Sequence, residues 1–365
     1  MKLLMIIPGL DKRLGGTTTL SIGFFDELRK LTSVTLVTTY TDQELDFIDD
    51  RFKNNPDVKL FRSFSNRIKY SSEQQKFLIK HINEYNLVHV HGLWHLGAYP
   101  ASKLAMKKNI PYIISPHGML EPDAMNRSKL KKQLFWKAGY AQVFKRANAI
   151  HCTAKNEISS TLRVEPTANT FLVPNGVNLP MTTYKKIPNQ LLFIGRVHPK
   201  KGIDRLIEAF ASLENSELKL IVAGTGDKTY ESEIKELIQS QQLTNQIKLI
   251  GFVDGDQKQK LLAESQIVCV PSFSEGMPLV SLETMASGTP LLITKPSNVP
   301  EVSEYDCGLE LENNEPKTIA EGIEVLLNSD LSKKAENAVN LVRSKFLWNK
   351  VARSLFDEYQ KYIKN

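Results

Sequence analysis

Two glutamates in the second half of the chain have the side-chain type and the spacing to bind sugar hydroxyls. Glu275 lies in a polar stretch, and Glu283 follows eight residues later in a segment with a helical pattern. Ionised carboxylates accept hydrogen bonds from hydroxyl groups, so this pair suits a ligand that carries hydroxyls at both of its ends. The residues between the glutamates indicate what the middle of that ligand is.

The segment between the two glutamates has the features of a helix start. Pro278 suits the first helical turn, because its missing N–H would have no partner there, and Gly288 suits the helix end. The start of such a helix directs backbone N–H groups and a partial positive charge toward Gly276 and Met277. An anion, and a phosphate in particular, is the natural occupant of that position.

Two cations near the start of the second half also favour a ligand that contains phosphate. Arg196 and Lys201 follow an apolar run typical of a strand and precede a helical pattern. There they would neutralise a diphosphate and stabilise the charge that develops on it as it leaves, without the protonating acid of a glycosidase. A pair of solvated surface cations is the alternative. Together with the glutamates, the cations indicate a nucleotide sugar, in which a pyrophosphate joins a hexose to a ribose.

The size and composition of the chain indicate a globular protein of two domains. Its 365 residues exceed one ordinary hydrophobic core, and 41% hydrophobic with 24% charged residues is typical of folded proteins. No apolar run reaches the roughly 18 residues of a membrane span, and we interpret the short apolar start as a buried strand rather than a signal peptide. The widely spaced Cys152, Cys269 and Cys307 favour a reducing, cytoplasmic setting.

The positive charge of the chain, +7 with a pI of about 9.0, favours polyanionic neighbours. The sequence carries no signature of a common nucleic-acid-binding module, so we do not expect nucleic acid as a partner. Residues 129–146 mix lysines with large aromatic side chains, and Leu130, Leu134 and Ala138 share one face of the expected helix. Such a helix can lie on an anionic bilayer at the inner face of the cell membrane. A domain helix with a solvated basic side is the alternative.

Strand-like and helix-like segments alternate along the whole chain, which predicts parallel sheets covered by helices. A turn-rich connector precedes Pro180, so we expect domains at 1–180 and 181–345, with a C-terminal helix in 346–365 that could pack back on the first domain. Two open α/β domains that face each other have a ligand cleft at the carboxyl ends of their strands. The expected strands are 2–8, 34–38, 87–91, 112–115, 149–152, 191–195, 218–223, 247–251, 267–270 and 290–293.

Glycines and histidines at strand ends are further candidates in the first half. Gly15 and Gly16 lie between the first strand and the first helix, where a ligand could approach the backbone closely; a plain turn is the alternative. His117 follows a strand directly and could hydrogen-bond a sugar hydroxyl or a phosphate oxygen, or else cap nearby backbone. His89 and His91 have no cysteine or acidic ligand at a recognised spacing, so we expect no metal site.

Together these motifs resemble those of the retaining glycosyltransferases with the GT-B fold, often called family 4 or group 1. The resemblance runs nearly from end to end, and its specificity lies in the combination and order of the motifs. The motifs are Gly15–Gly16, Ser115–Gly118, Val173–Val177, Gly195–Arg196 with Lys201–Gly202, Gly251–Val253, the pair Glu275 and Glu283, and Pro300–Val302.

The resemblance implies an α/β protein with two Rossmann-like domains facing across a cleft, in which the second domain holds most of the donor. It also implies that no metal or other cofactor is needed, because two cations already serve the leaving group. His117, Arg196, Lys201 and Glu275 are the candidate catalytic residues. The roles carried over are pyrophosphate binding by Arg196 and Lys201, sugar binding by Glu275 and His117, ribose binding by Glu283, contact with the base by Val253, and further donor contacts by Gly15, Gly16, Gly276, Met277 and Pro278.

The expected function is therefore transfer of a hexose-type sugar, with retention of anomeric configuration, from a nucleoside-diphosphate sugar to a hydroxyl acceptor. Acceptors in this family are often lipid-linked saccharides used for capsule, O-antigen or exopolysaccharide. The chain departs from the family pattern at Asn178, where an acidic residue is common, and at 297–299, where a Gly-Gly pair is frequent.

Three other functions remain open from the residues alone. A nucleotide-sugar epimerase or hydrolase of the same fold would need no acceptor. A nicotinamide-dependent dehydrogenase shares the alternation of strands and helices, but the first glycine loop lacks the three-glycine fingerprint. A sugar-binding subunit without activity is the third. The motifs do not specify the base, the sugar, the acceptor or the oligomeric state.

Overall fold

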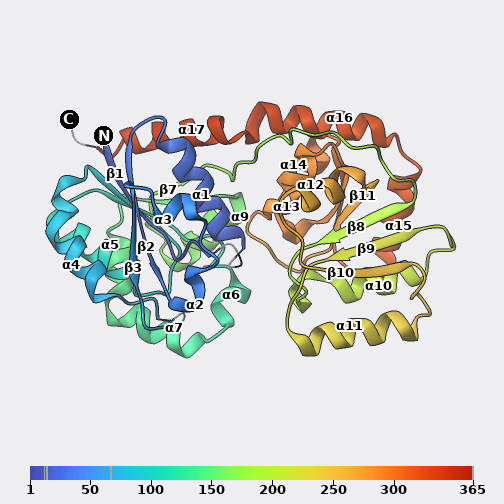
Figure 1. Ribbon diagram of the computed structural model, residues 1–365, viewed down its shortest axis with the longest axis horizontal. Coiled ribbons are helices and arrows are strands. Elements are labelled where there is room, and N and C mark those ends of the chain that lie inside the picture. The colour runs from blue at the N-terminus through green and yellow to red at the C-terminus, as the bar shows by residue number, and fades with distance from the viewer. Residues whose placement is uncertain (12, 14, 66–67, 364–365) are drawn as a thin grey trace. The chain divides into compact units, whose positions relative to one another are not determined.

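The chain folds into two compact units, each built around one parallel sheet (Figure 1). The computed structural model describes residues 1–11, 13, 15–65 and 68–363. One unit combines Met1–Gly176 with Trp348–Asn365, and the other is Val177–Leu347. The predicted α/β architecture of two Rossmann-like domains is confirmed.

The first unit contains a seven-stranded sheet in the order β3-β2-β1-β4-β5-β6-β7, with every neighbouring pair parallel. Its central strands are apolar and buried, because helices cover both faces of such a sheet. The strands are β1 (Lys2–Ile6), β2 (Ser33–Tyr40), β3 (Val58–Arg62), β4 (Leu87–His91), β5 (Tyr112–Ser115), β6 (Ala149–Cys152) and β7 (Thr170–Leu172).

Helices follow most strands of the first sheet, and their apolar faces complete its core. Pro100 lies in the first turn of α5, where a missing N–H is tolerated, and Asn109 ends that helix in the left-handed region at φ 56°. The helices are α1 (Gly16–Leu28), α2 (Asp42–Leu45), α3 (Asp50–Lys53), α4 (Ser72–His81), η2 (Ile82–Glu84), α5 (Tyr99–Lys108), α6 (Pro122–Asn126), α7 (Lys129–Phe135), η3 (Trp136–Tyr140), α8 (Ala141–Lys145) and α9 (Lys155–Val164).

The C-terminal helix α17 (Trp348–Gln360) belongs to the first unit and packs against α1 (Figure 1). Its first residue, Trp348, fits between two glycines. A Cβ atom at Gly23 would lie 2.2 Å from the Trp348 ring, and one at Gly176 would lie 2.3 Å from it. Any larger residue at either position would displace the indole ring and with it the start of α17.

The second unit contains a six-stranded parallel sheet in the order β10-β9-β8-β11-β12-β13. Its core is formed by apolar residues of the strands together with α10 and α15. The strands are β8 (Gln190–Ile194), β9 (Lys219–Ala223), β10 (Ile247–Gly251), β11 (Ile267–Val270), β12 (Leu291–Thr294) and β13 (Gly308–Leu311). The helices are η4 (Pro199–Lys201), α10 (Ile203–Ala211), α11 (Lys228–Ser240), α12 (Gly255–Glu264), α13 (Leu279–Ala286), η5 (Lys295–Ser297), α14 (Glu301–Glu304), α15 (Pro316–Leu327), α16 (Leu331–Leu341) and η6 (Val342–Phe346).

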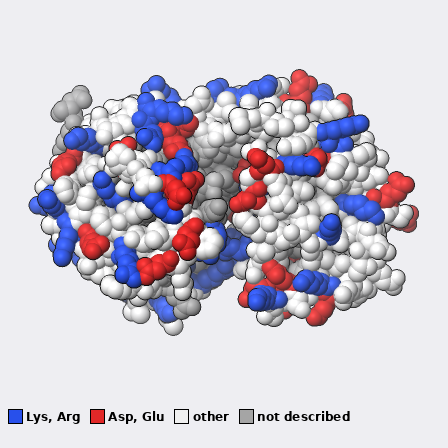
Figure 2. Space-filling model, viewed as in Figure 1, with Lys and Arg blue, Asp and Glu red and all other residues white. Residues whose placement is uncertain are grey.

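The surface carries charges of both signs. On the face shown in Figure 2, acidic side chains lie among the basic ones, so the positive net charge is not gathered into one patch there. Within the described part of the chain, no helix combines the length and the apolar character needed to cross a bilayer.

Candidate functional site

In each sheet the strand order reverses at one point, and such points place ligand sites at the carboxyl ends of the strands on either side. In the second sheet the reversal lies between β8 and β11, and in the first it lies between β1 and β4. Arg196 follows β8, and the loop with Glu275 follows β11. Gly15 follows β1, and His91 ends β4. The fold therefore places three of the selected residues, Arg196, Glu275 and Gly15, at these two points, whereas the selected His117 follows the next strand, β5.

Lys201 and Glu275 form an ion pair in the second unit. The Lys201 Nζ lies 2.6 Å from Glu275 Oε1, and the two side chains are 24% and 15% exposed. The next residue, Gly202, lets the loop after β8 approach the loop after β11 closely. It has φ 67°, and a Cβ atom there would lie 2.2 Å from the Pro271 carbonyl oxygen. The Phe273 N–H also donates to the Lys200 carbonyl at 2.9 Å. The loops after β8 and β11 are thus joined directly.

The backbone of Glu275 is held from its other side by the turn at η5. The Glu275 N–H donates to the Pro296 carbonyl at 2.9 Å, and the Asn298 side-chain amide donates to the Glu275 carbonyl at 2.5 Å. Asn298 adopts φ 59°, in the left-handed region that glycine and asparagine tolerate best. Its side chain thus holds the backbone of the Glu275 loop.

Glu283 lies in α13 and pairs with a lysine that sequence reasoning missed. The Lys258 Nζ, in α12, lies 2.7 Å from Glu283 Oε1 and 2.6 Å from Oε2. The two residues are 25 positions apart on different helices, so no spacing rule connects them. The prediction for Pro278 needs a correction: it precedes α13 as the N-cap residue with ψ 125°, because helical φ/ψ begins only at Leu279.

The remaining donor-site candidates of the second unit also follow the carboxyl ends of its strands. Arg196 is exposed, Gly276 is partly exposed and Met277 is buried, all in the loops after β8 and β11. Val253 follows β10 and is buried, while the neighbouring Phe252 is 58% exposed. The second-unit candidates thus lie together on the side of the sheet where its strands end.

In the first unit, His117 follows β5 and faces His91 at the end of β4. The His91 Nδ1 and His117 Nε2 atoms lie 2.9 Å apart, and the rings are stacked. Burial lowers the pKa of His117 to about 3, with His151 as a smaller cause, so the ring is neutral near pH 7. Its Nδ1 is buried and has no hydrogen-bond partner among the described residues.

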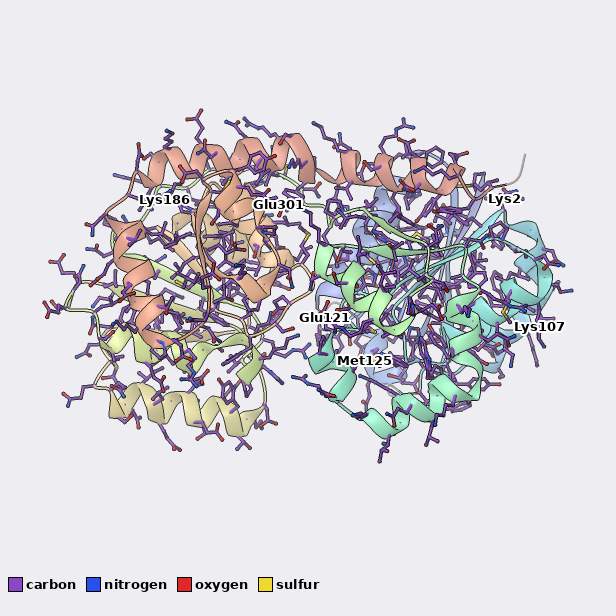
Figure 3. All side chains as sticks on the ribbon, turned by 180° about the vertical axis from the view of Figure 1, so that it is seen from behind. Lys2, Lys107, Glu121, Met125, Lys186 and Glu301 are labelled. Atoms are coloured by element: carbon purple, nitrogen blue, oxygen red, sulfur yellow. The ribbon has the colours of Figure 1, made fainter. Side chains whose placement is uncertain are left out.

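The loop after His117 is anchored by α9. Glu157 Oε1 accepts the Gly118 N–H at 2.6 Å, and Oε2 accepts the Thr153 N–H at 2.6 Å. Glu121, labelled in Figure 3, accepts a hydrogen bond from the Asn156 side chain at 2.9 Å. Gly15, at φ 79°, is the N-cap residue of α1, and Gly16, which the sequence placed before the helix, is its first residue.

The histidines of β4 are buried in the core of the first unit. His89 bonds Tyr359 through Nδ1 and Ser115 through Nε2, and Ser115 in turn bonds His151. Within the described residues, no group of three or more His, Cys, Asp or Glu side chains is arranged to hold a metal ion.

The basic segment 129–146 is not one continuous helix as expected. It divides into α7, a wide turn at η3 and α8, because Gly139 adopts φ 120° inside the turn. None of the α7 side chains is buried, and Leu130 and Leu134 are 76% and 70% exposed. This surface keeps the mixed basic and apolar character that the sequence indicated.

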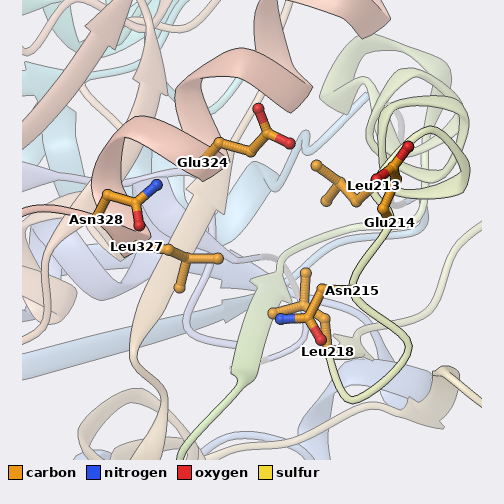
Figure 4. Close-up of a pocket in the computed structure, with 7 residues that line it drawn as sticks. All are labelled: Leu213, Glu214, Asn215, Leu218, Glu324, Leu327 and Asn328. Atoms are coloured by element: carbon orange, nitrogen blue, oxygen red, sulfur yellow. The ribbon is translucent and has the colours of Figure 1, made fainter.

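A cavity of about 350 Å³ lies near the amino end of β9 in the second sheet (Figure 4). It lies near the ends of α10 and α15, before β9 begins, whereas Lys201 and Glu275 follow carboxyl ends of strands. It is therefore separate from the candidate donor site. Its lining residues are Leu213, Glu214, Asn215, Leu218, Glu324, Leu327 and Asn328.

Two family models match the chain, one in each half. Residues 182–344 match the model described as glycosyl transferases group 1, and residues 14–180 match the model described as glycosyltransferase family 4. An uncharacterized glycosyltransferase of Methanocaldococcus jannaschii is 29% identical over 318 residues, which cover 84% of each chain.

Other curated relatives are matched over less than two thirds of their own length. The lipopolysaccharide 1,2-N-acetylglucosaminetransferase of Salmonella typhimurium is 31% identical over 222 residues, which cover 54% of this chain and 57% of that protein. Among solved structures, HepE of Anabaena in complex with UDP and glucose has a TM-score of 0.80 at 18% identity, over 99% of this chain and 100% of that one. This likeness confirms the expected GT-B fold.

Proposed function

We propose that this chain, whose two halves match the group 1 and family 4 glycosyltransferase models, transfers a hexose-type sugar from a nucleotide sugar to a saccharide hydroxyl with retention of configuration. The observation that carries the proposal is the ion pair of Lys201 with Glu275 at the strand-order reversal of the second sheet. A cation for a diphosphate and an acid for sugar hydroxyls meet there, where such folds bind ligands.

The proposal gives each donor-site group one task. Arg196 and Lys201 bind the diphosphate and stabilise its charge as it leaves. Glu275 accepts hydrogen bonds from hydroxyls of the transferred sugar, and Glu283 accepts them from the ribose. His117 exchanges a hydrogen bond with the donor through Nδ1. The other donor contacts are assigned to Gly15, Gly16, Val253, Gly276, Met277 and Pro278.

The chemistry that we propose needs no protein nucleophile and no metal or other cofactor. The acceptor hydroxyl attacks the anomeric carbon from the face that the diphosphate leaves. A new carbon–oxygen bond forms as the bond to the phosphate oxygen breaks, and the departing phosphate takes the acceptor proton. The positive charge that this leaving group needs comes from Arg196 and Lys201.

For the acceptor we propose a saccharide or lipid-linked saccharide used in surface polysaccharide. The support comes from relatives whose names concern lipopolysaccharide in Salmonella typhimurium, amylovoran in Erwinia amylovora and an O-antigen chain in Escherichia coli. The exposed Leu130 and Leu134 would insert into the anionic inner face of the cell membrane, and the lysines of α7 would contact its headgroups.

The test is a comparison of matched lysine variants after a donor screen. Thermal shifts with UDP, GDP and ADP sugars select the donor by the stabilisation that it gives. Lys201→Met should then lower kcat/KM by about a hundredfold, because it removes a charge from the leaving group. Lys200 is the neighbouring lysine in η4, and Lys200→Met should leave turnover unchanged. Equal turnover of both variants would refute the assignment, and isomerised or hydrolysed donor without any acceptor would refute transfer.

The membrane contact has its own measurement. The wild-type protein should co-sediment with vesicles of phosphatidylcholine and phosphatidylglycerol. It should not co-sediment with vesicles of pure phosphatidylcholine. The change of both Leu130 and Leu134 to Glu should abolish sedimentation without a change in melting temperature, because both side chains are exposed. Equal sedimentation of wild type and variant would contradict the contact.

A further inference from the structure

Lys258 bridges both oxygens of one carboxylate, which sets it apart from an ordinary surface lysine. Its Nζ lies 2.7 Å from Glu283 Oε1 and 2.6 Å from Oε2, and the two side chains are 28% and 22% exposed. On the same helix, Lys260 is 56% exposed and lies 3.8 Å from Glu264 one turn away. Exposed pairs of that second kind contribute little. The Lys258 contact links two helices and restrains a specific acid.

The position of Lys258 places it within the donor site that we propose. The helix α12 that carries it begins directly after the loop with Val253, to which we assign the base. The helix α13 that carries Glu283 begins directly after the loop with Glu275, to which we assign the transferred sugar. Contact between Lys258 and Glu283 therefore joins the base side of the site to its ribose side.

We infer that Lys258 is a positioning residue that holds the Glu283 carboxylate for two ribose hydroxyls. This inference rests on the proposed function, which assigns the ribose to Glu283. Lys258 donates a hydrogen bond to Oε1 and contacts Oε2 as an ion pair, and because each carboxylate oxygen has two lone-pair sites, each keeps one for a hydroxyl. The bridge also fixes the rotation of the carboxylate, so less rotamer entropy is lost when the nucleotide binds.

The test compares ribose with deoxyribose, because a merely structural role would not depend on a ribose hydroxyl. The nucleoside diphosphate among UDP, GDP and ADP that binds the wild type best is titrated by calorimetry alongside its 2′-deoxy form. Loss of the hydroxyl should weaken binding to wild type by about tenfold, since a hydrogen bond to a charged group is lost. In Lys258→Met the ribose form should weaken to near the deoxy form, so that the ratio falls toward one.

Control variants separate this effect from a general loss of structure. Lys260→Met should keep the wild-type ratio, and Lys258→Arg should restore part of it, because a guanidinium can also bridge two carboxylate oxygens. Melting temperatures without ligand report whether each variant is folded. Lys258→Gln provides a second neutral variant and should show the same loss of discrimination.

The outcomes distinguish this inference from the function on which it rests. If the wild type binds none of the three nucleotides, the proposed function fails and the inference fails with it. If the nucleotide binds and Lys201→Met weakens it, but Lys258→Met and Lys258→Gln keep the wild-type preference for ribose, only the role of Lys258 is refuted. A wild type without any preference for ribose would also refute it.

Discussion

The hydroxyl of Tyr359 ends a chain of buried hydrogen bonds whose direction is set by one carbonyl group. His151 Nε2 lies 2.8 Å from the Val173 oxygen and must carry the proton, so its Nδ1 accepts from Ser115 Oγ at 2.7 Å. Ser115 Oγ then accepts from His89 Nε2 at 2.7 Å, and His89 Nδ1 accepts the Tyr359 hydroxyl proton at 2.6 Å. Burial lowers the pKa of both histidines, so both rings are neutral.

Tyr359→Phe removes only the last donor of this chain. The aromatic ring stays in place, so no large cavity forms, but His89 Nδ1 becomes a buried acceptor without a partner. Both residues are fully buried, which prevents water from replacing the hydroxyl. The expected cost is about 1–3 kcal/mol of unfolding free energy for the first unit. For a domain of this size, that is about 2–4 °C of melting temperature per kcal/mol.

Scanning calorimetry with separate analysis of the transitions is the assay, because two units need not unfold in one step. Tyr362→Phe is the matched control, since its hydroxyl accepts from Asn169 Nδ2 at 3.2 Å in a partly exposed position. We expect that control to change stability by less than about 0.5 kcal/mol. Equal effects of the two variants would show that the directed chain does not stabilise α17 on the first unit.

Three further predictions follow from buried contacts. Burial lowers the pKa of His151 to about 4 from an ordinary value of 6.5, so the unfolded chain binds more protons as the pH falls through this range. Urea titrations should therefore show a loss of about 1.4 kcal/mol per pH unit for this group between those values. Glu157→Gln turns an amide donor toward the Gly118 or Thr153 N–H and should cost about 1–3 kcal/mol, measured by urea titration against wild type. Asn298→Asp should raise the KM for the donor sugar severalfold and leave affinity for the nucleoside diphosphate unchanged in calorimetry, because it loses the amide donor to the Glu275 carbonyl.

The sequence predicted the central strands of both sheets but missed three strands, and all three lie at sheet edges. β3 and β7 are the two edges of the first sheet, and β13 is one edge of the second. β3 has only one buried residue, Val58, and β7 is only three residues long. An edge strand packs against fewer neighbours, so its sequence needs no continuous apolar run, and the pattern that marks a central strand is weak there.

The candidate site was predictable as far as its residues follow strand ends. Arg196, Glu275 and His117 lie in the segments that follow strands whose apolar runs are clear in the sequence, and in a parallel sheet the carboxyl ends of all strands lie on the same side. The helix start at Pro278 was misplaced by one residue, because proline is tolerated both at the N-cap and in the first turn.

What the sequence could not indicate is how the charges of the site are neutralised. A carboxylate that is four-fifths covered needs a partner, because an unpaired charge is costly to remove from water. The folded chain provides one lysine for each acid: Lys201 for Glu275, and Lys258 for Glu283. These partners lie 74 and 25 positions away along the chain, and nothing in the local pattern of either acid requires a lysine at those places. The motif therefore specifies Lys201 and the two acids as groups that would touch a donor, whereas only tertiary packing shows which lysine pairs with which acid and brings in Lys258.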